Sequence, residues 1–395
     1  MGITRLIALL KEKCPSSIKK KKLGAYVGQI FALDASMAMY QFLIATQQVK
    51  VGWTIAELKD PEGNLTGHLL GLYNRSIMLM NHGIKPVWVF DGKPPEAKIN
   101  VLRGRKEKKE DAKKGEEEAI DQGDMEKALK FANQTVRITE KMTEDAKKLI
   151  NLMGLPVIQA TSEAEASCSI LAKSGKANVA ATEDMDSLCF GCPILIRDLT
   201  NKEEEVTEIN LKDVLEGLEL TMDEFIDVCI LCGCDYCSKI EGIGPVNAYK
   251  LIKEYKNIEG VIKYADNYNK DPSHKKKLSY DLSTFTYEEA RKLFKEPSVI
   301  NPDSFVFSWN KVKEDELKQF MVNEKGFDEK RIDNLISKIS QAKSKSNQTR
   351  MDNFFQIKTV SSSQSGLKLS KPLTDKKCNK DKKNKCNTNK CKTKK

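Results

Sequence analysis

The chain has 395 residues, 40% of them apolar, which is ordinary for a globular protein and enough for one large domain or two. It contains no apolar run long enough to cross a bilayer, and the N-terminus lacks a secretory signal, so we expect a soluble intracellular protein without membrane association. The formal net charge is +10, but residues 376–395 carry ten Lys against one Asp, so an anion-binding surface elsewhere requires segregation of charge.

Short apolar runs alternate with longer helix-like stretches through the first half of the chain. The runs cover residues 29–34, 85–91, 155–160, 178–183 and 193–197. This alternation predicts an α/β fold in which a mostly parallel sheet lies between two layers of helices. In such a sheet, ligands bind beyond the carboxyl ends of the strands.

The remaining segments indicate how the chain is divided. A stretch dense in Lys, Arg and Glu, residues 96–150, predicts exposed helices inserted over the sheet. Short helices follow in 211–262 and again in 286–340, and from about residue 341 the polar, Lys-rich composition predicts disorder with short docking motifs. The predicted regions are therefore 1–95, 96–150, 151–262, 263–340 and 341–395.

Acidic residues lie at or just beyond the ends of the apolar segments. There are seven of them: Asp34, Asp91, Glu163, Glu165, Asp184, Asp186 and Asp235. At the carboxyl edge of one sheet these side chains would converge on a single cleft. Ionised carboxylates that share a site repel one another unless divalent metal neutralises them, so the pattern predicts metal-assisted chemistry.

Local patterns leave alternatives open for the individual acids. Asp184 and Asp186 continue a strand-like run, so alternation would point both side chains to one side. Asp34 and Asp91 follow strands and could instead be N-caps of the next helices. Residues 162–165, Ser-Glu-Ala-Glu, could form a capping box or direct both glutamates to a metal. Capping accounts for single residues but not for all seven acids together.

Five blocks of sequence, in this order, resemble the signature of a known family. They are Asp34-Ala35-Ser36, Phe90-Asp91-Gly92-Lys93-Pro94-Pro95, Ser162-Glu163-Ala164-Glu165-Ala166, Ala181-Thr182-Glu183-Asp184-Met185-Asp186 and Gly233-Cys234-Asp235-Tyr236. From Met1 to about Phe355 the chain is similar to the eukaryotic and archaeal flap endonucleases, which are structure-specific 5′-nucleases. The resemblance implies a monomer with a PIN-like three-layer α/β/α nuclease core, whose parts are the N-terminal region 1–95, the internal region 151–262 and the C-terminal helices of 263–340.

The resemblance also implies a ligand set for two Mg²⁺ ions per chain, which Mn²⁺ can replace. One ion would be held by Asp34, Asp91, Glu163 and Glu165, and the other chiefly by Asp184, Asp186 and Asp235. Hard oxygen ligands suit these cations. A metal pair of this kind lowers the pKa of an attacking water and stabilises the entering and leaving oxygens of a phosphodiester.

Two basic residues are candidates for catalysis. Lys98 and Arg105 are seven residues apart, which places them on one helix face, and they match the family's basic pair that faces the scissile phosphate. By the same resemblance, residues 96–150 form a helical arch through which the free 5′ end passes, and Tyr40 stacks on a base. The expected DNA contacts are Gly2, Tyr40, Arg75, Arg105, Glu163, Gly233, Asp235, Gly242 and Gly244.

Gly242 and Gly244 lie just after the last acidic block. Glycines allow backbone amides to approach a phosphate closely, and a following helix adds its positive N-terminal end, although a plain interhelical turn would need glycine as well. The resemblance favours a helix–two-turn–helix motif with a bound structural K⁺. The chain departs from the family where basic residues are common, at Gln47, Glu241, Val246 and Asn247.

Four of the eleven cysteines are clustered around Asp235. Cys229 with Cys232, and Cys234 with Cys237, form two C-x-x-C pairs separated by one residue, whereas ordinary zinc modules have a dozen or more residues between ligand pairs. We therefore expect small, buried, reduced residues rather than a zinc site.

The tail, 341–395, contains a candidate partner site at residues 348–355. Gln348, Met351, Phe354 and Phe355 have the spacing of a docking box for the trimeric sliding clamp, so we call residues 348–355 the clamp box. The Lys-rich end is typical of nuclear targeting or of nonspecific DNA attraction. We expect a nuclear protein, in nucleoplasm and nucleolus, with a mitochondrial pool as a second location.

Together these features predict a Mg²⁺-dependent 5′ flap endonuclease with 5′–3′ exonuclease activity. By resemblance its roles are Okazaki fragment maturation in DNA replication and long-patch base excision repair. Two alternatives remain: a sibling 5′-nuclease specialised as an exonuclease or for gapped and bubble DNA, and a non-catalytic DNA-junction binder or sliding-clamp adaptor. The complete set of seven acids argues against the second.

Overall fold

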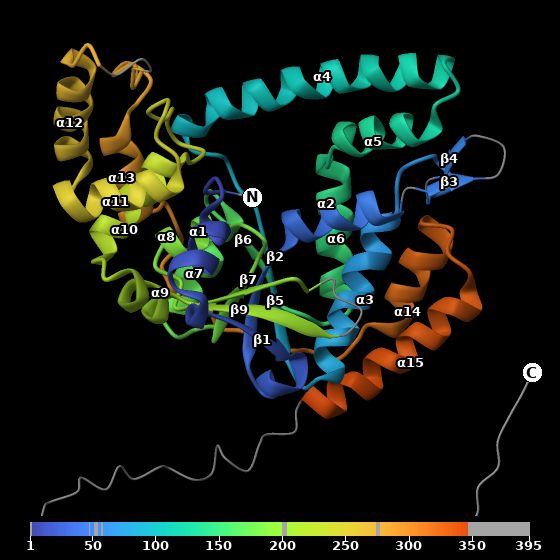
Figure 1. Ribbon diagram of the computed structural model, residues 1–395. Helices are drawn as coiled ribbons and strands as arrows, with labels where there is room; N and C mark the ends of the chain where they lie inside the picture. Colours follow the sequence, from blue (N-terminus) through green and yellow to red (C-terminus); the bar gives the residue numbers. More distant parts are fainter. Residues whose placement is uncertain are drawn as a thin grey trace, which may run out of the picture. The chain divides into compact units, whose positions relative to one another are not determined.

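The computed structural model describes residues 2–46, 48–50, 54–56, 58–199, 204–273 and 277–346. Its centre is a seven-stranded sheet (Figure 1). In spatial order the strands are β1 (Ile18–Lys22), β9 (Glu205–Asn210), β8 (Ile194–Arg197), β7 (Val179–Ala181), β2 (Ile30–Asp34), β5 (Lys85–Phe90) and β6 (Val157–Gln159). The strands from β8 to β6 run parallel, and β9 and β1 are antiparallel to their neighbours. The predicted α/β class with a mostly parallel sheet is confirmed.

The two faces of the sheet carry separate cores because side chains alternate along each strand. On β2, Phe31 and Leu33 belong to one core and Ala32 to the other. Trp88 and Val87 of β5 divide in the same way. The first core packs against α2 (Ala35–Thr46), α3 (Gly67–Asn81), α6 (Glu140–Leu152) and α15 (Glu329–Ser346).

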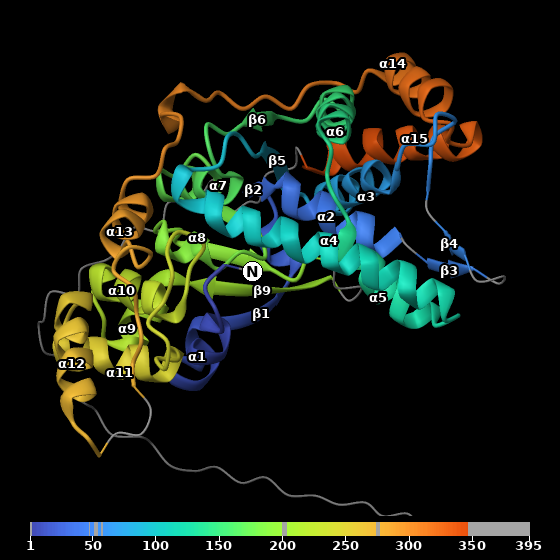
Figure 2. The same ribbon diagram turned by 90° about the horizontal axis from the view of Figure 1, so that it is seen from above.

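The second core lies beneath the helices on the opposite face of the sheet. They are α1 (Leu6–Lys13), α7 (Ala164–Lys173), α8 (Asp186–Cys189), α9 (Leu211–Leu218), α10 (Met222–Cys232), α11 (Pro245–Tyr255), α12 (Ile258–Lys270) and α13 (Tyr287–Lys295). Figure 2 shows α10 to α13 gathered at the end of the sheet away from α14 (Glu314–Lys318) and α15. Helix α10 has a complete capping box between Thr221 and Glu224, which fixes where it begins.

The five predicted strands form, and β7 ends two residues earlier than expected. Strand β7 ends at Ala181, so Asp184 lies in the following loop and Asp186 is the first residue of α8. The prediction that alternation along a strand aligns these two side chains is therefore wrong. Strands β1 and β9 and the hairpin β3 (Gln48–Lys50) with β4 (Thr54–Ala56) were not expected.

The predicted insertion consists of two helices that cross over the carboxyl edge of the sheet, α4 (Ile99–Asp121) and α5 (Met125–Thr135) (Figures 1 and 2). We call α4 and α5 the arch. They pack on each other through a small cluster formed by Ala119, Met125 and Ala128, with Phe131 against it. Helix α6 belongs to the core instead, so the boundary predicted at residue 150 falls inside the core layer.

Two helices also run across the later predicted boundaries. Helix α12 crosses the boundary predicted at residue 262, and α15 continues to Ser346, beyond the predicted start of the tail at residue 341. Short helical turns complete the chain: η1 (Pro15–Ser17), η2 (Leu23–Tyr26), η3 (Glu96–Lys98), η4 (Pro302–Ser304) and the π-helical η5 (Gln319–Glu324). Within the described ranges, no helix combines the length and the apolar character of a membrane span.

Candidate active site

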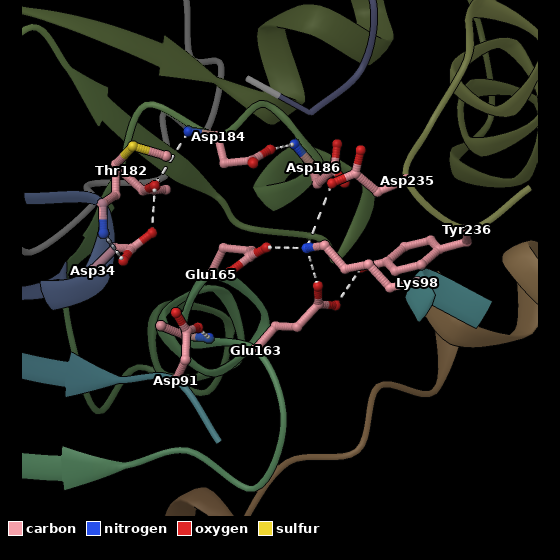
Figure 3. A network of polar contacts seen from close by, with 12 residues as sticks. Asp34, Asp91, Lys98, Glu163, Glu165, Thr182, Asp184, Asp186, Asp235 and Tyr236 are labelled. Carbon is pink, nitrogen blue, oxygen red and sulfur yellow. Dashed lines mark hydrogen bonds and ion pairs between the residues drawn. The ribbon is translucent and has the colours of Figure 1, made fainter. Parts of the chain in front are cut away.

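The carboxyl edge of the sheet and the arch enclose a cavity of about 680 Å³. Six of the seven predicted acids line it, and Asp186 lies just behind, next to Asp184. All except Asp91 are at least nine-tenths buried. The structure therefore brings the predicted acids together, from the ends of β2 and β5, the start of α7, the β7–α8 loop and the end of α10 (Figure 3).

Asp34 and Asp91 each use one carboxylate oxygen to cap a helix. The backbone N–H of Met37, in the first turn of α2, donates to Asp34 Oδ1 at 2.9 Å. The backbone N–H of Ala164, the first residue of α7, donates to Asp91 Oδ1 at 2.7 Å. Asp34 is thus an N-cap as the alternative proposed, whereas Asp91 caps a helix distant in sequence. Capping and a role in the site are compatible, because each carboxylate has a second oxygen.

Glu163 and Glu165 lie at the start of α7 and face the cavity. Glu163 is the N-cap residue, but its side chain makes no capping hydrogen bond. Its Oε2 accepts a hydrogen bond from the hydroxyl of Tyr236, and Lys98 Nζ contacts its Oε1. Lys98 Nζ also lies 3.5 Å from Glu165 Oε1. These contacts favour the site over the capping box for both glutamates.

Asp184 and Asp186 are aligned by the backbone of the β7–α8 loop. The N–H of Asp186 donates to Asp184 Oδ1 at 2.9 Å, and the N–H of Asp184 donates to Thr182 Oγ1 at 3.1 Å. The hydroxyl of Thr182 in turn donates to Asp34 Oδ2 at 2.9 Å, which joins this loop to β2 (Figure 3). Both carboxylate oxygens of Asp186 are buried without a partner among the described residues.

Gly2 passes directly against this loop. A Cβ at Gly2 would lie 1.9 Å from Asp184 Oδ1 and 2.2 Å from Asp186 Oδ1, and its φ is +71°, a conformation that favours glycine. The N–H of Thr4 donates to the carbonyl of Gly233 at 3.1 Å. The N-terminal segment therefore borders the acids, and the DNA contacts predicted for Gly2 and Gly233 stay predictions.

Burial and mutual repulsion make ionised carboxylates unfavourable here. Burial raises the pKa of Asp34 to about 7, and repulsion from Asp91 adds to the effect. Burial likewise raises the pKa values of Glu165 and Asp186, with neighbouring carboxylates contributing. The unpartnered oxygens of Asp186 and this concentration of acids fit a site for divalent cations, which would relieve both penalties.

Two cations of the arch root occupy the space between the acids. Lys98 Nζ contacts Glu163 and lies 3.5 Å from Asp235 Oδ2, and Arg105 donates to both oxygens of Asp235 at 2.8 and 2.6 Å. Burial would lower the pKa of Lys98, but attraction from Glu165, Glu163 and Asp235 outweighs it and raises that pKa. Lys98 thus lies between the carboxylates. Within the described segments, no three acidic, His or Cys side chains surround one point as metal ligands would.

The cavity is also lined by residues of α2 and of the arch. Tyr40 is half-buried there, and Lys109 Nζ lies 5.9 Å from the centre of its ring. Lys109 donates to the carbonyl of Val136 at 3.0 Å, which ties α4 to the chain that follows α5. Tyr40 thus lines the same cavity as six of the acids, and its stacking on a substrate base stays a prediction.

The structure places other predicted DNA contacts outside the cavity. Arg75 is only 7% exposed, donates to Gln41 Oε1 at 3.3 Å and stacks on Phe42, so its guanidinium is not presented at the surface for DNA. Gly242, with φ +95°, precedes Gly244, which is the N-cap of α11. This arrangement is compatible with both interpretations of the glycines: a plain interhelical turn, and a loop whose backbone amides bind a phosphate.

Some predicted residues lie outside the described ranges. They are Gln47 and the clamp box with its four candidates Gln348, Met351, Phe354 and Phe355. The four clustered cysteines are described. Cys229 and Cys232 are buried in α10 as expected, whereas Cys234 and Cys237 differ from the expectation because they are partly exposed.

Three polar residues of the site were not singled out from the sequence. Tyr236 supports Glu163, Thr182 supports Asp34, and Lys109 approaches Tyr40. Tyr236 directly follows Asp235, and Thr182 lies two residues before Asp184. Both are inside the sequence blocks that carry the resemblance, so their positions could have indicated a role in the site. Lys109 had none, because it is one of many bases on a charged helix.

Comparison with known proteins identifies the family. Residues 1–112 match the XPG N-terminal domain and residues 154–235 the XPG I-region. Flap endonuclease 1 of Tetrahymena thermophila is 46% identical over 381 residues, which cover 96% of this chain and 99% of that protein. Flap endonuclease 1-2 of Paramecium tetraurelia is 49% identical over 358 residues, which cover 90% of this chain and 91% of the relative.

Solved structures agree with this result. The flap endonuclease-1 of Methanococcus jannaschii has a TM-score of 0.60 at 32% identity and covers 83% of this chain and 97% of its own. The catalytic core of Rad2 in complex with a DNA substrate shares the fold, with a TM-score of 0.66 at 23% identity, covering 86% of this chain and 100% of its own. With relatives this similar over nearly their whole length, the chain belongs to the flap endonuclease family.

Proposed function

We propose that this protein is a Mg²⁺-dependent nuclease that cleaves 5′ flaps at single-strand/double-strand junctions of DNA and also acts as a 5′–3′ exonuclease. The observation that carries the proposal is the group of buried carboxylates with raised pKa values at the sheet edge, roofed by an arch whose cations reach into it. Mn²⁺ would serve in place of Mg²⁺, because both prefer oxygen ligands.

Different residues of the chain have different roles at the proposed site. Two divalent metals, when bound by the seven acids, would supply an activated water and stabilise the entering and leaving oxygens of the phosphodiester. Thr182 and Tyr236 hold Asp34 and Glu163 in the orientation that faces the cavity. Asp91 keeps its second oxygen for the site while its first caps α7.

Lys98 and Arg105 would change partners during the reaction. In the free protein they neutralise Glu163, Glu165 and Asp235. When those carboxylates are neutralised by metal, both cations become available for the scissile phosphate, where they stabilise the charge that develops in the transition state. The arch that carries them would then close over the 5′ strand, with Tyr40 stacking on a base beside the bond that breaks.

The rest of the proposal concerns grip on DNA and cellular role. Gly242 and Gly244 before α11 would cradle a phosphate of the downstream duplex, with K⁺ as a structural ion. We propose roles in Okazaki fragment maturation and long-patch base excision repair in the nucleus, with a mitochondrial pool, and docking of the clamp box on the trimeric sliding clamp. The protein would act as a monomer.

The proposal is tested with a double-flap DNA labelled at its 5′ end, with single-stranded and nicked DNA as controls. The parent should release the flap only when Mg²⁺ is present. Asp184→Ala should abolish cleavage but preserve flap binding, since it removes a metal ligand and leaves the surfaces that grip phosphate in place. Near-normal turnover of the variant at saturating Mg²⁺ would contradict the metal site. Binding of the flap by a parent that never cleaves it would instead favour the non-catalytic junction binder.

A further inference from the structure

A pair of thiols lies beside the site and has no part in the chemistry above. Cys234 Sγ and Cys237 Sγ are 3.8 Å apart, in the bend that follows α10. They flank Asp235 and Tyr236 in sequence. Both are partly exposed, whereas the other six cysteines of the described segments are buried. These two residues are therefore the most exposed of the described cysteines.

We propose that Cys234 and Cys237 form a reversible dithiol–disulfide site that a hydroperoxide oxidises, and that the disulfide slows the nuclease. The C-x-x-C spacing and the sulfur contact carry the first part. Disulfides in reducing compartments are typically transient and redox-sensing, which fits a partly exposed pair. The second part rests on the proposed function, because it assigns Asp235 and Glu163 to the metal site.

The reaction balances with the peroxide as the oxidant. The sulfur of one cysteine attacks an oxygen of the hydroperoxide, the O–O bond breaks, and the leaving oxygen takes the thiol proton, which gives a sulfenic acid and water or an alcohol. The second sulfur attacks the sulfenic sulfur, the S–S bond forms, the S–O bond breaks, and the departing hydroxide takes the second thiol proton as water. The two sulfurs lose two electrons in total, and the peroxide gains them.

Closing the bond must disturb the two residues between the cysteines. A disulfide requires a sulfur separation of about 2 Å, well below the present contact. Asp235 accepts from Arg105, while Tyr236 donates to Glu163 and packs edge-on against Phe294 with ring centres 5.0 Å apart. On the far side, the N–H of Ser238 donates to the carbonyl of Thr284 at 3.0 Å. On the near side, the carbonyl of Gly233 accepts from the N–H of Thr4 at 3.1 Å. Because the segment is held on both sides of the cysteines, we expect the displacement to fall on Asp235 and Tyr236.

A zinc site is the other use that two such thiols could have. It would need further ligands, and the sulfur contact of each of these thiols is with the other thiol. The neighbouring pair Cys229 and Cys232 has the same spacing but is buried within α10. That pair is therefore a matched internal control, because its cysteines have the same spacing in sequence but are buried.

The test uses the full-length chain with Cys378, Cys386 and Cys391 changed to Ser, so that the tail thiols do not compete. This reference protein is treated with hydrogen peroxide in EDTA, quenched, unfolded and alkylated, then reduced and alkylated with a second reagent. The second label should appear on Cys234 and Cys237 together, and the intact protein should lose two hydrogen atoms. Cys229 and Cys232 should carry the first label.

Cys237→Ser in the reference protein isolates the second step. Without a partner thiol, the oxidised variant should gain an oxygen atom instead of losing two hydrogens. Oxygen gain without hydrogen loss in the reference protein would overturn the proposal. So would a disulfide to any other cysteine, or one between two chains.

Cleavage of the double flap decides the coupling to the site. The oxidised reference protein should cleave on the order of tenfold more slowly or worse, recover with dithiothreitol, and lose this sensitivity when Cys234 and Cys237 are both Ser. A disulfide that leaves the rate unchanged would overturn the coupling. A reference protein that cleaves no flap even when fully reduced would contradict the proposed function instead, and the mass measurements would still decide whether the disulfide forms.

Discussion

Asp34→Asn should make the metal-free protein more stable at neutral and alkaline pH. The folded protein keeps a proton on Asp34 until its raised pKa of about 7, whereas the unfolded chain releases it near 3.8. The stability contributed by that proton is complete below pH 3.8 and is lost as pH rises through about 7. Asn carries no charge at any pH, and its oxygen can still accept from the N–H of Met37.

The magnitude follows from the two pKa values. At about 1.4 kcal/mol per pH unit, the interval from 3.8 to about 7 corresponds to about 4 kcal/mol of unfolding free energy. The acids share protons with one another, so this value is an upper bound and we expect a gain of about 1 to 4 kcal/mol at pH 8. The gain should be smallest near pH 4, grow up to about pH 7 and then stay level.

Urea unfolding in EDTA across pH 5 to 8 measures this difference. The control is Asp213→Asn, an Asp that pairs with Lys19 at the surface, and it should change the unfolding free energy little at any of these pH values. Added Mg²⁺ should stabilise the parent more than Asp34→Asn, because the variant has lost a ligand. The reasoning is refuted if the variant is less stable than the parent at pH 8 in EDTA, or if the difference does not change with pH.

Three further predictions concern the arch, the N-terminal segment and the tail. Lys98→Ala and Arg105→Ala should each slow single-turnover cleavage by about a hundredfold or more with smaller losses in flap affinity, and equal losses in both would make them ordinary phosphate anchors. Gly2→Ala places a Cβ 1.9 Å from a carboxylate oxygen of the site and should also slow single-turnover cleavage by about a hundredfold. The control is Gly28→Ala, at φ +79° with open space around it, which should keep near-normal cleavage. Replacing both phenylalanines of the clamp box with Ala should preserve basal cleavage and abolish stimulation by sliding clamp titrated into the assay, and equal stimulation of variant and parent would place the docking site elsewhere.

The acids could be predicted from sequence because the parallel sheet fixes where strand ends meet. Asp34 follows a run of apolar residues, and its position at the carboxyl edge needs no knowledge of tertiary contacts. Asp184 and Asp186 lie next to each other as predicted, but the geometric reason given for it was wrong. What aligns them is a hydrogen-bonded loop and the start of a short helix, and that arrangement depends on contacts with Thr182 and Gly2.

Two of the strands that were not predicted, β1 and β9, carry charged residues where strands usually carry apolar side chains. Strand β1 is Ile18 followed by four lysines, a sequence typical of a solvated segment, and it survives as an edge strand because lysine is tolerated there. Strand β9 buries Glu208, whose carboxylate accepts hydrogen bonds from Tyr26 and Lys21. Because a charged residue occupies a buried position, the sequence of β9 does not show the apolar–polar alternation of a strand. The burial of Arg75 was unpredictable for a similar reason, since it depends on the side chains of Gln41 and Phe42 from another helix.

The two ion pairs at the root of the arch differ in their access to water, and this difference has a mechanical consequence. The Lys98 side chain is 12% exposed and that of Arg105, two helical turns further along the chain, is 42% exposed. Dissolved salt screens exposed charges far more than buried ones. Rising ionic strength should therefore weaken the Arg105–Asp235 ion pair before it weakens the Lys98–Glu163 ion pair. Helix α4 should then rotate about its first turn, which Lys98 keeps in place. Under the proposed function, the space between α4 and the sheet edge that would admit a 5′ strand should therefore vary gradually with ionic strength.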